Sequence, residues 1–91
     1  MSFVAHAFHR VDAARRLMTV PGMGAEASGR LFFAKRLHEA AKAAERGGPR
    51  VDLDVLLEDV LTSLDGAAAA GARREADEAR AYDKGGSGAY L

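Results

Sequence analysis

One stretch decides the fold of this 91-residue chain: residues 51–65, VDLDVLLEDVLTSLD. Its large apolar residues recur at positions 53, 56, 57, 60, 61 and 64, which is the spacing of one face of a helix. Asp52 is suited to cap the start of this helix, and Asp65-Gly66 is suited to end it. The sequence therefore predicts a helix at about 53–65 whose apolar face lies in the core. Only Val55 has no obvious structural place on that face.

Proline and glycine separate this helix from two earlier ones. Val20-Pro21 ends a first helix that runs from about residue 2 to residue 19, and Gly47-Gly48-Pro49 ends a second that begins at about residue 25 or 28 and ends near residue 46. In the first helix, the predicted core stripe is Val4, Phe8, Val11, Ala14 and Met18. The opposite side carries His6, His9, Ala13 and Arg16. In the second helix, the core stripe is Phe33, Leu37, Ala40, Ala41 and Ala44.

The C-terminal part has a different composition. Residues 67–84 consist almost wholly of alanine and charged residues, with an apolar stripe made only of alanine, so they form either a docked fourth helix, an exposed extension of the third, or a helix ordered only in an assembly. Residues 85–91 are rich in glycine and form a flexible tail. The predicted fold is all-α: a small bundle of three core helices (residues 1–66), an Ala-rich charged helix (67–84) and the tail (85–91).

Opposite charges are segregated along the chain although the formal net charge is zero. The charged residues of 30–50 are mostly basic, whereas those of 51–65 are all acidic: Asp52, Asp54, Glu58, Asp59 and Asp65. Opposite charges help to decide which surfaces meet. The acidic helix is therefore expected beside a basic helix or a basic partner.

The residue types argue against catalysis. The chain has no cysteine, so disulfides, thiolate zinc sites and a cysteine nucleophile are excluded. His6, His9 and Asp12 share a helical spacing, but a zinc site needs further ligands, so solvated histidines are the better interpretation. No phosphate-binding loop or nucleophile motif is present. We predict no enzyme, no catalytic residue, no cofactor and no metal.

The location of the protein follows from what the sequence lacks. It has neither an apolar run long enough to span a membrane nor the pattern of a secretory signal. The expected location is the cytoplasm or a particle assembled inside the cell, without a membrane partner. The abundance of Ala, Arg, Gly and Asp is typical of a GC-rich bacterial or phage genome.

Two functions remain. The first is a non-enzymatic protein–protein interaction module, such as an adaptor, an assembly or structural component, or an inhibitor, that binds a protein partner or itself. Its docking surface comprises exposed helix faces and the C-terminal segment, with partner-binding residues Leu31, Phe32, Arg36, Tyr82, Tyr90 and Leu91. The alternative is a small nucleic-acid-binding protein that contacts phosphates through its basic second helix, at Arg30, Lys35, Arg36, Lys42, Arg46 and Arg50. The chain has no Asn or Gln to read adenine, so phosphate contacts would dominate.

Overall fold

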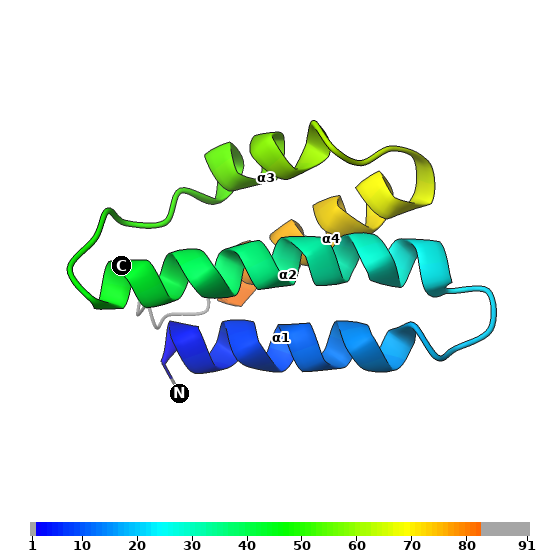
Figure 1. Ribbon diagram of the computed structural model, residues 1–91, viewed down its shortest axis with the longest axis horizontal. Coiled ribbons are helices and arrows are strands. Elements are labelled where there is room, and N and C mark those ends of the chain that lie inside the picture. Colours follow the sequence, from blue (N-terminus) through cyan, green and yellow to red (C-terminus); the bar gives the residue numbers. More distant parts are fainter. Residues whose placement is uncertain (1, 83–91) are drawn as a thin grey trace.

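Helix α2 (Gly24–Glu45) is the element against which α1 and α4 pack, whereas α3 contacts both α4 and α2. The computed structural model describes residues 2–82, and this part of the chain contains four helices and no strand. The other helices are α1 (Phe3–Leu17), α3 (Leu53–Leu61) and α4 (Gly66–Tyr82). Figure 1 shows α1 below α2, α3 above it and α4 behind it. The predicted all-α bundle is confirmed, while the predicted tail at 85–91 lies outside the described residues.

Helix α3 begins where the sequence predicts and ends four residues early. The Asp52 side chain caps its start by accepting hydrogen bonds from the backbone N–H groups of Asp54 (3.0 Å) and Val55 (3.2 Å). The helix ends at Leu61, and Thr62 follows it, donating its hydroxyl to the Asp59 carbonyl at 2.7 Å. The prediction of a helix to residue 65 was wrong because a helix C-terminus disfavours carboxylates such as Asp65. Asp65 instead precedes α4, where its carbonyl accepts the Ala69 N–H at 3.2 Å.

The buried face of α1 differs from the predicted stripe. It consists of Phe3, Ala7, Val11 and Ala14. Phe8, predicted to lie in the core, is 53% exposed, and Met18 is also exposed. Since neighbouring residues lie about 100° apart around a helix, this arrangement turns His6 and Arg10 towards α4, where they contact Tyr82 and Glu75. The prediction that His6 lies on the side away from the core was therefore wrong.

Small residues let α4 approach α2 closely. A Cβ atom added to Gly29 would lie 1.7 Å from the Ala68 carbonyl oxygen, and one added to Gly71 would lie 2.1 Å from the Glu26 carbonyl oxygen. Neither position can hold a side chain without separating the two backbones. The alanine stripe of α4 is buried in this contact and in the core beyond it, at Ala72, Ala76 and Ala79. Of the arrangements open to residues 67–84, the described part of this segment thus adopts the docked helix.

Candidate functional site

A cluster of buried charges joins α1, α2 and α4. Glu75 of α4 is 1% exposed and accepts hydrogen bonds from Arg10 Nε at 2.6 Å, Arg10 Nη2 at 3.1 Å and Arg30 Nε at 3.0 Å. Both arginines also form ion pairs with Glu78. The hydrogen bond to Glu75 raises the pKa of Arg10 although burial opposes it. Because the carboxylates are matched by guanidinium groups, the cluster fixes three helices relative to one another and offers no unpaired group for chemistry.

A groove of about 450 Å³ lies between α2 and α3. The sequence creates it at the connection, where Gly47 adopts a φ of +95° and the Gly48 N–H binds the Ala43 carbonyl at 2.9 Å. This turn leads the chain back along α2, which lines that side with Ala40, Ala43 and Arg36. We call "the groove" the space lined by Arg36, Ala40, Ala43, Pro49, Arg50, Val51, Asp52, Val55, Leu56 and Asp59. Its lining is apolar at the centre and charged at the ends.

The α3 side of the groove exposes a large apolar side chain. Val55 is 60% exposed, more than any other large hydrophobic residue within residues 2–82. It belongs to a run of exposed residues on one face of α3, which we call "the α3 row": Val55, Glu58, Asp59 and Thr62. The charged members of this row are both acidic. An acidic rim around an exposed valine is therefore the character of this side.

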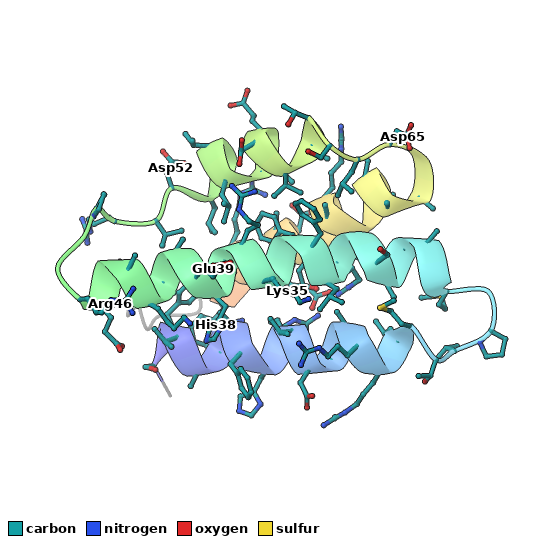
Figure 2. All side chains as sticks on the ribbon, viewed as in Figure 1. Lys35, His38, Glu39, Arg46, Asp52 and Asp65 are labelled. Carbon is teal, nitrogen blue, oxygen red and sulfur yellow. The ribbon has the colours of Figure 1, made fainter. Side chains whose placement is uncertain are left out.

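The exposed face of α2 next to the groove is predominantly basic. Exposed residues recur there at spacings of three and four, which places them on one face of the helix. We call this face "the α2 stripe": Ser28, Phe32, Lys35, Glu39, Lys42 and Arg46. Figure 2 shows its Lys35, Glu39 and Arg46 along the same helix. Phe32, Lys35, Arg36 and Glu39 line a second depression of about 180 Å³, which shares Arg36 with the groove.

Ion pairs connect the acidic helix α3 to the basic α2, as the charge segregation predicts, and also to α4. Arg36 of α2 pairs with Asp59 of α3, and Arg80 of α4 pairs with Asp54. The hydrogen bond from Arg80 to Asp54 raises the pKa of Arg80. Lys35, Lys42 and Glu58 form no ion pair in the described part of the chain. The two helices that form the groove thus carry unpaired charges of opposite sign.

The predicted partner-binding residues fall in different places. Phe32 is exposed beside the half-buried Arg36, and Leu31 is half-buried. Tyr82 contacts α1 instead: its ring stacks on that of His6, with centroids 3.8 Å apart, and also contacts the ring of Phe3. Tyr90 and Leu91 lie outside the described residues. Sequence reasoning left Val55 out of the site, although its position off the apolar stripe was the signal that could have identified it.

The predicted phosphate-binding residues are divided in a similar way. Arg30 is only 5% exposed and is bound to Glu75 and Glu78. It therefore contributes nothing to an exposed basic surface. Arg36 is held by Asp59. The others lie exposed on α2 or just after it: Lys35, Lys42, Arg46 and Arg50.

The histidines are not gathered into a metal site within residues 2–82, where no group of three or more His, Cys, Asp or Glu side chains is placed to hold an ion. His6 is turned towards Tyr82, and burial, followed by the nearby Arg10 charge, lowers its pKa. His38 lies on the other side of α2 with its ring 5.5 Å from that of Phe8. Burial and the Lys42 charge lower the pKa of His38.

The chain matches no protein-family model, no curated protein and no solved structure. A search of residues 2–82 for a helix long and apolar enough to cross a membrane also finds none. The observations that bear on function are therefore the geometry and the charges of the groove, the α2 stripe and the α3 row.

Proposed function

We propose that this chain is a non-enzymatic protein–protein interaction module that docks through the groove together with the α2 stripe and the α3 row. The observation that carries the proposal is Val55, a valine 60% exposed at the edge of an apolar groove. An apolar centre surrounded by charged residues is the usual anatomy of a protein interface. An adaptor, an assembly component and an inhibitor all use such a surface.

Phe32 and Arg36 extend this surface towards the N-terminal half of α2. Aromatic and arginine side chains are enriched among the residues that dominate binding free energies. Arg36 is already oriented by Asp59, so less conformational entropy is lost when a partner covers it. Both residues belong to the partner-binding set predicted from the sequence.

The nucleic-acid alternative draws less support from the geometry. Arg30 and Arg36 are bound to carboxylates, and the remaining cations of α2 share its exposed face with acidic residues such as Glu39. Phosphate binding requires several cations that are free to release counterions. We expect no salt-dependent binding to a labelled DNA duplex between about 50 and 200 mM salt. Binding that weakens steeply over this range would favour the alternative.

Site-specific photo-cross-linking in the native cells tests the proposal. A benzoylphenylalanine in place of Val55 or Phe32 should give discrete protein adducts, because both positions would lie inside an interface. Val20 provides the matched control, since it is also an exposed valine but belongs to the connection between α1 and α2. Adducts at 55 and 32 that are absent at 20 support the proposal. An identical pattern at all three positions, or no adduct at 55 and 32, contradicts it.

A further inference from the structure

We infer, resting on the proposed function, that the occupant of this surface is a second copy of the same chain. The two copies are related by a two-fold axis that runs between α2 and α3, parallel to their lengths. This rotation places the α2 stripe of each copy on the α3 row of the other. It also brings the two grooves together on the axis.

Charge complementarity supports this occupant. The α2 stripe is predominantly basic and the α3 row is acidic. Val55 and Asp59 of the row line the groove, and the stripe lines the second depression, which shares Arg36 with the groove. A two-fold axis parallel to the helices exchanges the two sides, so each basic side meets an acidic side, and it does so twice. An axis across the helices would instead place α2 on α2 and α3 on α3, with like charges opposed. The chain's net charge of zero also means that two copies do not repel each other as a whole.

The charges also match in position along the helices. The Arg36–Asp59 pair places these residues at one level, and the groove places Ala40 and Ala43 near the level of Val55. Figure 1 shows that α2 and α3 run in opposite directions alongside each other. Rotation about an axis parallel to them preserves each level. Lys35 of one copy consequently faces Glu58 of the second copy, and neither residue forms an ion pair within its own chain over residues 2–82.

The apolar groups fit the same arrangement. Val55 projects from the α3 side of the groove, and the α2 side offers the small residues Ala40 and Ala43. The rotation moves Val55 of the second copy from the α3 side to the α2 side, over these alanines. The exposed valine and the space beside small residues then fill one another, as packing at an interface core requires.

Sedimentation equilibrium of the full chain tests the inference directly. We expect a concentration-dependent species of twice the 9.6 kDa chain mass. Val55→Arg should abolish it, because an arginine would be placed at the apolar centre. Val20→Arg makes the same change at the control valine and should leave it unchanged. A wild-type chain that stays monomeric to about 1 mM overturns the inference, as does a dimer that survives Val55→Arg.

A charge-exchange experiment tests the orientation of the two copies. Lys35→Glu alone creates two acidic contacts and Glu58→Lys alone creates two basic ones, so each variant should dimerise about tenfold or more weakly at low salt. An equimolar mixture of the two variants restores both opposite-charge contacts and should form a heterodimer of wild-type affinity. The chain with both substitutions should likewise form a homodimer. Restoration in neither experiment overturns the proposed orientation, while circular dichroism checks that every variant is folded.

The two proposals fail in different ways. A monomeric wild-type chain whose position 55 still cross-links to another protein removes the second copy as occupant and leaves the interaction module standing. The absence of adducts of either kind at position 55 removes both. Cross-links between two copies of the chain at position 55, lost in Val55→Arg, support both.

Discussion

Replacing Glu75 by alanine is the perturbation to which the structure should be most sensitive. Glu75 is the carboxylate that links α1 and α2 to α4, through Arg10 and Arg30. Without Glu75, the Arg30 guanidinium keeps only Glu78 as a partner. The Arg30 side chain is 7% exposed, so water cannot hydrate it where it lies. The variant thus leaves the buried Arg30 charge with only a partner that is itself 41% exposed.

The size of the effect follows from burial. Removing one partner of a buried ion pair costs about 3–5 kcal/mol, because the other charge stays desolvated. A chain of this size has a free energy of unfolding of about 5–15 kcal/mol in total, so Glu75→Ala removes a large part of it. The corresponding fall in Tm is roughly 12–40 °C. Glu78→Ala is the matched control: the Glu78 side chain is 41% exposed, and the buried Glu75 still neutralises Arg30 without it, so this variant should cost clearly less than Glu75→Ala.

Urea denaturation followed by circular dichroism measures these differences. The paired replacement Arg30→Met with Glu75→Leu should recover part of the loss, because it removes the stranded charge along with its partner. Glu75→Ala and Glu78→Ala of equal cost would refute the reasoning, since burial would then make no difference. A paired replacement no more stable than Glu75→Ala would show that the loss has another origin than the stranded Arg30.

Three further predictions concern single positions. Gly71→Ala should destabilise the protein by about 1–3 kcal/mol in thermal unfolding, because its Cβ would meet the Glu26 carbonyl oxygen; Gly24→Ala, which meets nothing within 4 Å, is the control and should be neutral or slightly stabilising. Asp52→Ala should lower the free energy of unfolding by about 1 kcal/mol through loss of the α3 cap, and an unchanged urea midpoint would contradict this. Burial and the Arg10 charge lower the pKa of His6 below 6.5 in the folded state. The contribution of neutral His6 to the free energy of unfolding is therefore fully present above pH 6.5, and it is lost as the pH falls through the folded pKa. Between roughly pH 7.5 and pH 5, the window around the unfolded pKa, His6→Phe should therefore show a smaller fall in Tm than wild type. Equal slopes of Tm against pH in the two proteins would count against this assignment.

Local signals in the sequence were sufficient to locate the helices. Asp52 acts as the predicted cap, and the breaks at Pro21 and Gly47 fall between helices as expected. These features act over a few residues, so their effect does not depend on the rest of the chain. The end of α3 is the exception, because Asp65 is disfavoured at a helix C-terminus and instead precedes α4.

The faces of the helices depended on contacts that are distant in sequence. The apolar face of α1 could begin at Phe3 or at Val4, which are both apolar. Periodicity alone favoured the face that begins at Val4 and includes Phe8. The choice of Phe3 places Arg10 against Glu75, 65 residues away, and a buried carboxylate requires such a partner. The groove has the same origin, since its volume depends on how the Gly47–Asp52 connection sets α3 against α2. Val55 could be recognised as unusual from the sequence, but not as the edge of a groove.

The helices also differ in how firmly they are held, and this bears on docking. The Glu75 cluster and the close contacts at Gly29 and Gly71 fix α1, α2 and α4 together. Helix α3 is nine residues long and has only two residues fully in the core, Leu53 and Val60. An isolated helix of this length is unstable in water, so its order depends on those contacts and on the ion pairs to α2 and α4. A second copy that covers the α3 row binds only the ordered helix and must stabilise it by mass action. In the proposed dimer, docking and the folding of α3 are therefore linked, and the helix that presents Val55 would gain most from the interface that Val55 would form.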